Sequence, residues 1–383
     1  MTIRRLLGYA LVVACVVSLV GPGFSAPGAA PIKIGLNMDY SGAAAFEGQG
    51  VYKGATLAFD EANAAGGVNG HKFIPILGDN QCDPSVGINA IRSLIAANVD
   101  AIIGSNCSSV TLGQMPIIQS ARIPMLAVED SNPKITEQAG VGGNIWMFRL
   151  NVNDEAMAVV FGRRVIAKEV KTLAILAAQT DYGRGVVDAM RANTPGVTIV
   201  SVDYAQLGQS DFRSILTKVK AESPEGVLIA FDYPEGSQIL NQMHEVGLTN
   251  VKVYSRGVIV APEVFKLLAN PHWADGIKEA NFWAPGLPQS KYLEDKYNAR
   301  YHEPLTRPSG MGYFGAKALM QAVSMINGPV TPASIRSALE KVNFDIPGLG
   351  HVQFDSHHQA HYPMALTGIV DGKIVNLATV PTN

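Results

Sequence analysis

Short apolar runs alternate with stretches of helical periodicity along most of this chain. In the first half, the runs predict buried parallel strands at residues 32–38, 73–77, 101–103 and 125–128. Helices are predicted at residues 50–64 and 84–97, and Asp83 and Pro84 suit the N-cap and the first position of the second helix. This alternation is typical of a parallel sheet that is covered by helices on both faces.

The same alternation begins again after Arg149. Strands are predicted at residues 172–177, 198–203, 227–231 and 251–254, and helices at residues 153–167, 183–191, 211–220 and 238–246. A third block, at about 289–327, is helical again, and the tail predicts a hairpin through Asp371 and Gly372. The pattern therefore predicts the α/β class, with two doubly wound parallel sheets rather than one.

Length and composition agree with two lobes and narrow the possible partners. The chain has 383 residues, of which 47% are hydrophobic and 16% are charged. A chain of this length is longer than most domains with a single hydrophobic core, so we expect two lobes. The formal net charge is −2, and no cluster of Lys and Arg occurs beyond the first five residues. Nucleic acid is therefore not expected as a partner.

The N-terminus has the pattern of an export signal. Arg4 and Arg5 precede an apolar run at residues 6–20, and small residues follow, so we predict a signal peptide over residues 1–30. The candidate cleavage residues are Ala26, Ala29 and Ala30. Cys15 offers an alternative, because the residues before it loosely match a lipoprotein box and would leave it lipid-anchored. Either route places the mature chain in the periplasm.

Removal of the signal leaves two cysteines, Cys82 and Cys107. Cys82 precedes a predicted helix and Cys107 follows a predicted strand, which places both on the same edge of a βαβ layer. In an exported chain, two such cysteines favour a disulfide over a metal pair, and two buried thiols are the alternative. Closing this loop would stabilise the fold by about 3 kcal/mol in the chain-entropy model.

Hydroxyl residues follow the second cysteine, at the corner between a strand and a helix. Ser108 and Ser109 lie beside free backbone N–H groups and the positive end of a helix dipole, which is a suitable place for a carboxylate. Ordinary helix capping is the alternative explanation. Other strand ends are also polar or aromatic, as expected for a cleft between lobes: Tyr40-Ser41, Asn80, Glu129 to Ser131, Thr180 to Tyr182, Asp232-Tyr233 and Ser255-Arg256.

Several motifs resemble the periplasmic solute-binding proteins of branched-chain amino acid ABC importers. They are SG at 41–42, CDP at 82–84, NCSS at 106–109, FR at 148–149 and DYG at 181–183. The resemblance implies a type I periplasmic binding fold, in which three crossovers form a hinge between two lobes. It places residues 31–150 and about 285–348 in lobe 1, and residues 151–284 and about 349–383 in lobe 2.

The resemblance also assigns residues to the site. Ser108 matches the position whose backbone N–H binds the ligand carboxylate in relatives, Ser131 a second carboxylate-binding hydroxyl, and Tyr182 the cleft aromatic of the second lobe. Departures from the family pattern fall on six further candidate residues: Arg256, Asp232, Tyr233, Glu129, Asp130 and Glu47.

Arg256 is the departure that bears most on the ligand. It stands where amino-acid-binding relatives have the glutamate that holds the ammonium, and a guanidinium binds a second carboxylate, a phenolate or a carbonyl instead. This favours an organic or aromatic acid over a branched-chain amino acid. Alternatively, Arg256 neutralises Asp232 or Glu129 across the cleft, and a carboxylate left over would then take an amine.

The favoured function is capture of a small carboxylate-bearing ligand for an ABC importer. The expected partners are that ligand and the permease subunits in the membrane, with the chain itself a monomer, without cofactor and not an enzyme. A ligand-sensing receptor of the same fold and an exported hydrolase are the alternatives.

Four histidines, at 351, 357, 358 and 361, have a spacing that occurs in metal sites. The residues around them have the pattern of strand and turn. We therefore expect a solvated loop here and no metal site.

Overall fold

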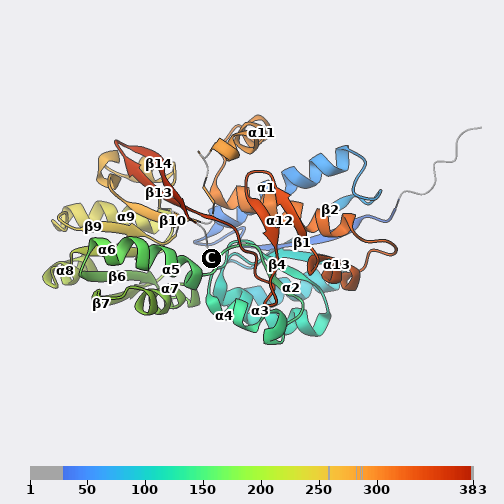
Figure 1. The fold of residues 1–383 in the computed structure, drawn as a ribbon, viewed down its shortest axis with the longest axis horizontal. Helices are drawn as coiled ribbons and strands as arrows, with labels where there is room; N and C mark the ends of the chain where they lie inside the picture. The colour runs from blue at the N-terminus through green and yellow to red at the C-terminus, as the bar shows by residue number, and fades with distance from the viewer. Residues whose placement is uncertain (1–28, 258, 282, 285, 287, 381–383) are drawn as a thin grey trace, which may run out of the picture.

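The molecule has two lobes, each with one main sheet between layers of helices, and they lie side by side along its long axis (Figure 1). The computed structural model describes residues 29–257, 259–281, 283–284, 286 and 288–380. The apolar run at 6–20 and Cys15 lie outside the described residues. Within the described part, no helix combines the length and the apolar character that a membrane span requires.

Five parallel strands form the sheet of the first lobe. In spatial order they are β2 (Phe73–Asp79), β1 (Ile32–Met38), β3 (Ala101–Gly104), β4 (Met125–Ala127) and β5 (Met147–Arg149). Strand β3 is buried along its whole length, and β1 nearly so, which explains why β3 is a continuous apolar run and why apolar residues dominate β1. The four strands predicted in this half of the chain are confirmed, with ends within two residues.

The described part of the first lobe has seven α-helices. They are α1 (Ala45–Ala64), α2 (Pro84–Ala96), α3 (Ser108–Ala121), α4 (Pro133–Gln138), α11 (Lys291–Tyr301), α12 (Arg307–Ser324) and α13 (Pro332–Leu339). The predicted cap of α2 is confirmed, because the Asp83 carboxylate accepts hydrogen bonds from the backbone N–H groups of Ser85 and Val86 at 2.8 and 2.9 Å.

Helix α1 begins five residues earlier than the predicted start at Gly50. Gly48 lies before the predicted start, but the fold needs it inside the helix. A Cβ on Gly48 would lie 2.3 Å from the carbonyl oxygen of Asp39. Close approach of two backbones therefore explains Gly48, and this correction brings Glu47 into the first turn of α1.

Seven strands form the sheet of the second lobe. In spatial order they are β14 (Lys373–Val380), β13 (Met364–Val370), β10 (Lys278–Asn281), β9 (Lys252–Ser255), β8 (Gly226–Ala230), β6 (Thr172–Ala178) and β7 (Thr198–Ala205). Strands β13 and β14 are antiparallel to their neighbours and the rest are parallel. The predicted hairpin through Asp371 and Gly372 is confirmed, and both residues have positive φ, at 49° and 67°.

Among the described residues, six α-helices and a π-helical turn surround this sheet. They are α5 (Asp154–Phe161), the π-helical turn Gly162–Ile166, α6 (Ala167–Glu169), α7 (Asp181–Asn193), α8 (Arg213–Ala221), α9 (Tyr233–Glu245) and α10 (Val264–Leu267). Helix α9 begins five residues before the predicted start at residue 238, because Pro234 suits its first turn. Asp232 is therefore an N-cap residue and Tyr233 is helical.

The chain passes between the lobes three times: between β5 and α5, between β10 and α11, and before β13. A separate hairpin, β11 (Asn343–Ile346) with β12 (Gly350–Gln353), precedes the third passage. Phe354, just after it, packs edge-on against Phe148 of the first lobe at 5.4 Å. We therefore propose that lobe 1 extends to about residue 360 rather than 348.

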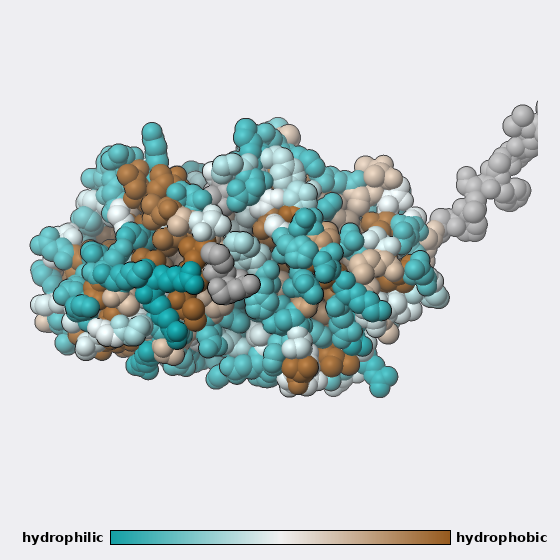
Figure 2. Space-filling view, in the orientation of Figure 1, coloured by the Kyte–Doolittle hydropathy of each residue, from teal (hydrophilic) through white to brown (hydrophobic). Residues whose placement is uncertain are grey.

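Apolar side chains on the surface gather on the hairpin of β13 and β14, at the upper left of Figure 2. Val370 is 49% exposed and Leu377 is 42% exposed. The rest of the visible face is mainly hydrophilic, as expected for a chain that meets water (Figure 2).

Candidate functional site

A pocket lies between the lobes, at the carboxyl ends of the parallel strands of both sheets. It encloses about 620 Å³ of space between atoms, counted to its opening, which suits a small ligand. Its described lining consists of Ala44, Glu47, Cys82, Asn106, Cys107, Ser108, Ser109, Glu129, Asp130, Ser131, Ala178, Thr180, Tyr182, Leu207, Phe231, Asp232, Arg256, Gly257 and Arg307. The fold thus brings together strand ends that are far apart in the sequence.

One wall of the pocket is the first turn of helix α3. Cys107 caps this helix without a side-chain hydrogen bond, and its disulfide to Cys82 ties the corner to the start of α2, which confirms the predicted pairing. The Ser108 hydroxyl oxygen accepts hydrogen bonds from the backbone N–H groups of Ser131 and Asn132, at 3.3 and 3.2 Å. The N–H groups of Val110 and Thr111 donate to the carbonyl oxygen of Cys107, at 2.9 and 3.0 Å, so the N–H groups of Ser108 and Ser109 are the donors that the corner offers to an anion.

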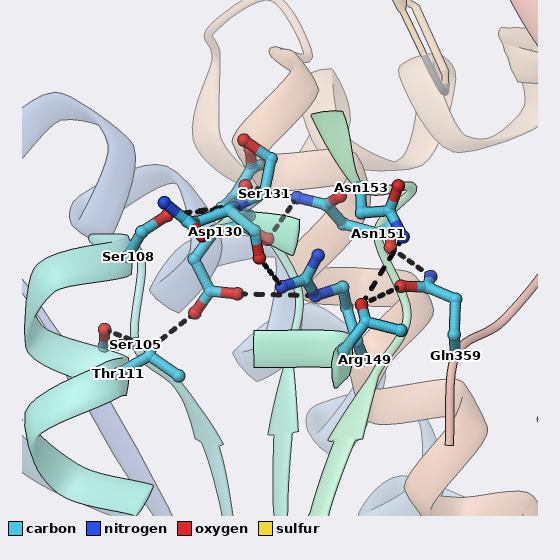
Figure 3. A network of polar contacts seen from close by, with 12 residues as sticks. Ser105, Ser108, Thr111, Asp130, Ser131, Arg149, Asn151, Asn153 and Gln359 are labelled. Carbon is cyan, nitrogen blue, oxygen red and sulfur yellow. Dashed lines mark hydrogen bonds and ion pairs between the residues drawn. The ribbon is translucent and has the colours of Figure 1, made fainter. Parts of the chain in front are cut away.

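A buried polar network supports this wall from below (Figure 3). The Asp130 carboxylate accepts a hydrogen bond from the Thr111 hydroxyl at 2.5 Å and lies 4.0 Å from the Arg149 guanidinium. Arg149 also donates to the carbonyl oxygen of Asn132 at 2.5 Å. Asn151, on the first passage between the lobes, donates to the carbonyl oxygens of Glu129 and Asp130. The network therefore fixes the loop that carries Ser131 and connects it to the hinge.

The buried carboxyl groups of the pocket have pKa values well above their ordinary range. Burial raises the pKa of Glu47 to about 8, the neighbouring Glu129 adds to the rise, and Arg307 opposes it. Burial raises the pKa of Glu129 to about 7 against the attraction of Arg307. Burial likewise raises the pKa of Asp130 to about 6, although Arg149 stabilises its charged form. The pocket thus holds more negative charge than it can easily neutralise.

The two arginines of the pocket wall already have acidic partners. The Arg256 guanidinium lies 2.6 Å from Asp154 of its own lobe and 5.8 Å from the centre of the Tyr182 ring. Arg307 lies 2.9 Å from Glu129 and 3.7 Å from Glu47. Our alternative of an ion pair from Arg256 to Asp232 or Glu129 is therefore wrong, because Asp154 takes that place.

Nine of the ten predicted site residues line this pocket. The exception is Tyr233, whose position in the first turn of α9 turns its ring toward Phe46, at a centroid distance of 4.3 Å. Tyr233 lines a neighbouring, more apolar pocket instead.

Sequence reasoning missed Arg307, which contacts two of the pocket's carboxyl groups. It is the first residue of α12, after the N-cap Thr306. A cation at a helix N-terminus interacts unfavourably with the helix dipole. This unfavourable position is the sequence signal that could have identified Arg307. Asn106, in the NCSS motif, and Thr180, at a polar strand end, also line the pocket.

The histidines of the tail do not form a metal centre in the part of the chain that the structure describes, where no group of three or more potential ligands occurs. His358 stacks on Phe148 with the ring centres 4.1 Å apart, and His361 lies 2.8 Å from Asp355. These residues therefore have structural contacts.

Comparison with known proteins gives one family and one fold. A family model described as "Periplasmic binding protein" matches residues 31–373. An "Amino acid binding protein" of Pseudomonas aeruginosa is 29% identical over 311 residues, which cover 80% of this chain and 81% of the relative.

Among solved structures, the branched-chain amino acid substrate-binding protein LivJ of Streptococcus pneumoniae, in complex with isoleucine, has a TM-score of 0.81 at 23% identity, covering 92% of this chain and 99% of that one. A solute-binding protein of R. palustris, in complex with benzoate, has a TM-score of 0.83 at 18% identity, covering 92% and 97%. At these identities the likeness of the structures concerns the fold.

Proposed function

The chain belongs to the periplasmic binding protein family, and on that premise we propose that it is the extracytoplasmic solute-binding component of an ABC importer. Its ligand is a small molecule that carries a carboxylate. The observation that carries this proposal is the hydroxyl-rich first turn of α3, with Ser108 and Ser109, which faces a pocket between two lobes. Ser131, on the facing loop, adds a third hydroxyl.

Contacts between the lobes support a ligand-dependent closure. The backbone N–H of Asp181 donates to the Ser109 hydroxyl at 3.0 Å, and the Asn132 amide donates to the carbonyl oxygen of Asp181 at 2.5 Å. Arg307 donates to the carbonyl oxygen of Gly257 at 3.0 Å. A ligand that touches both walls stabilises this arrangement, because its contacts with the far lobe exist only when the lobes are closed.

The candidate ligands follow from the relatives and from the lining. LivJ was solved with isoleucine and the R. palustris protein with benzoate, and both ligands carry a carboxylate. Tyr182 would contact the body of the ligand, since its ring lines the pocket. Arg256 no longer favours an organic acid as the ligand, because Asp154 already neutralises its guanidinium.

The substitution Ser108→Ala tests whether the first turn of α3 binds the ligand carboxylate. We expect ligand binding to weaken by about 1–3 kcal/mol, because a charged acceptor loses a donor and two loop N–H groups lose their acceptor. Isothermal titration calorimetry with leucine, isoleucine and benzoate would show which of them binds and would measure the change in its affinity. Ser120→Ala, near the exposed end of the same helix, is the matched control and should leave the affinity unchanged. An unchanged affinity in Ser108→Ala would show that the Ser108 hydroxyl does not bind the carboxylate.

A further inference from the structure

A second pocket, which we call the side pocket, lies between the lobes next to the first. It encloses about 550 Å³ of space between atoms, counted to its opening. Its described lining includes Phe46 and Pro308 of lobe 1 and Val260 and Pro262 of lobe 2, so a largely apolar wall comes from both lobes. A cavity of this character suits an aryl ring or an aliphatic chain.

The side pocket adjoins the pocket described above. Arg307 lines both of them. On α1, Glu47 lines the first pocket and the preceding residue, Phe46, lines the side pocket. Across the gap, Asp232 lines the first pocket and Tyr233 lines the side pocket. A ligand of the first pocket that is long enough to pass Arg307 would therefore reach the side pocket.

Trp283, on the second passage between the lobes, brings a donor without a partner to the side pocket. It is 2% exposed, and its Nε1–H has no acceptor among the described residues. The ring edge opposite Nε1 packs on α12, since a Cβ on Gly310 would lie 2.3 Å from Cζ3 of Trp283. Nε1 therefore lies on the side away from α12, and the residue lines the side pocket. A buried indole N–H usually has an acceptor, so this one calls for an acceptor on a ligand.

Asn281 brings an acceptor without a partner to the same pocket. It is 2% exposed and lines the side pocket. Its Nδ2 donates to the Glu279 carboxylate at 2.7 Å and to the Thr367 hydroxyl at 3.1 Å, which fixes the orientation of the amide. Its Oδ1 has no donor among the described residues. The apolar wall thus contains one buried donor and one buried acceptor that only a bound molecule can pair.

Glu279, the buried acid of this wall, already has its donors. Its carboxylate accepts hydrogen bonds from the Ser255 hydroxyl at 2.6 Å and from the backbone N–H groups of Ile259 and Val260, both at 2.9 Å. These bonds hold the segment after β9 against β10. Glu279 therefore supports the wall, and the groups left for a ligand are Trp283 Nε1 and Asn281 Oδ1.

We infer that the side pocket is a hydroxyl-binding site, and that the ligand of the first pocket extends into it with an apolar body that carries a hydroxyl group. A hydroxyl accepts a hydrogen bond and donates another, so one group pairs both Trp283 and Asn281. This inference rests on the proposed function and deepens it. The ligand class is a hydroxylated carboxylic acid that is longer than isoleucine or benzoate.

Pairs of acids that differ only in the hydroxyl provide the test. Titration calorimetry would compare 3-(4-hydroxyphenyl)propanoate with 3-phenylpropanoate, 5-(4-hydroxyphenyl)pentanoate with 5-phenylpentanoate, and 8-hydroxyoctanoate with octanoate. The three pairs vary the distance between the carboxylate and the hydroxyl. We expect the hydroxylated acid of at least one pair to bind about 10- to 100-fold more tightly, because its partner leaves both buried groups unpaired.

The substitution Trp283→Phe should remove most of this preference. Phenylalanine keeps an aromatic ring against Phe314, whose ring centre lies 5.3 Å from that of Trp283, but it has no N–H group. Affinity for the hydroxyl-free acid should therefore change little. Trp273→Phe is the matched control and should keep the preference, because Trp273 stacks on His244 and is outside the described lining of both pockets.

The outcomes separate the inference from the proposed function. If no hydroxylated acid binds more tightly than its partner, the hydroxyl-binding site is overturned, and binding of leucine, isoleucine or benzoate would leave the proposed function standing. A preference that survives in Trp283→Phe would also overturn the site. Binding of 4-ethylphenol alongside the tightest hydroxylated acid would contradict a shared ligand. If none of these carboxylates binds, the proposed function fails and the inference with it.

Discussion

Replacing Arg149 by leucine should lower the free energy of unfolding by about 3–5 kcal/mol at pH 8, because it leaves a buried carboxylate without its cation. Arg149 is 1% exposed, and Asp130 is 2% exposed. The guanidinium also donates to the carbonyl oxygen of Asn132, so the substitution releases the loop that carries Ser131. Urea unfolding of the full mature chain would measure the loss.

The pH dependence of this loss identifies its cause. Burial already holds the pKa of Asp130 near 6 with Arg149 present, and removal of the cation should raise that pKa further. Protonation of Asp130 then relieves the variant, so the loss should be smaller at pH 5 than at pH 8. Combining Arg149→Leu with Asp130→Asn should recover much of the stability at pH 8. A loss below about 1 kcal/mol in the single variant would show that this ion pair is not a structural requirement.

Replacing Gly54 by alanine should destabilise the first lobe by about 3 kcal/mol, because helices α1 and α12 touch at this residue. A Cβ on Gly54 would lie 1.8 Å from the carbonyl oxygen of Ser309 and 2.9 Å from the backbone nitrogen of Tyr313. Backbone atoms cannot move aside as a flexible side chain can, so the helices must separate. Thermal and urea unfolding of the variant would measure the effect.

Gly113 in helix α3 offers the same substitution with the opposite expected sign. A Cβ there would meet no atom within 4 Å, so Gly113→Ala should stabilise the protein by about 0.5–1 kcal/mol through helix propensity. Equal effects at the two glycines would show that the contact between α1 and α12 is looser than the structure indicates.

Features that depend on local sequence were predictable. The strands at residues 32–38 and 172–178 are largely buried and mostly apolar, and their apolar character is independent of what packs on them. The cap at Asp83 and the turn at Asp371-Gly372 are set by side chains within a few residues of each other. The alternation of strands and helices predicted parallel sheets, and both main sheets are mostly parallel.

Features that depend on distant partners were not predictable. The early start of α1 rests on Gly48, which accommodates the neighbouring backbone of Asp39, and no local signal distinguishes it from a loop glycine. The partner of Arg256 could not be chosen among several acids, because Asp154 comes next to it only when α5 packs beside the sheet. The residues of the pocket were largely foreseeable because strand ends of parallel sheets converge, whereas their charge pairing was not.

A crystal structure of the protein with its tightest-binding carboxylate ligand tests the central claim most directly. The account predicts the ligand between closed lobes, with a carboxylate oxygen within about 3 Å of a backbone N–H of the first turn of α3 and near the Ser131 hydroxyl. A ligand bound outside this pocket, or one whose carboxylate points away from Ser108 and Ser109, would contradict it.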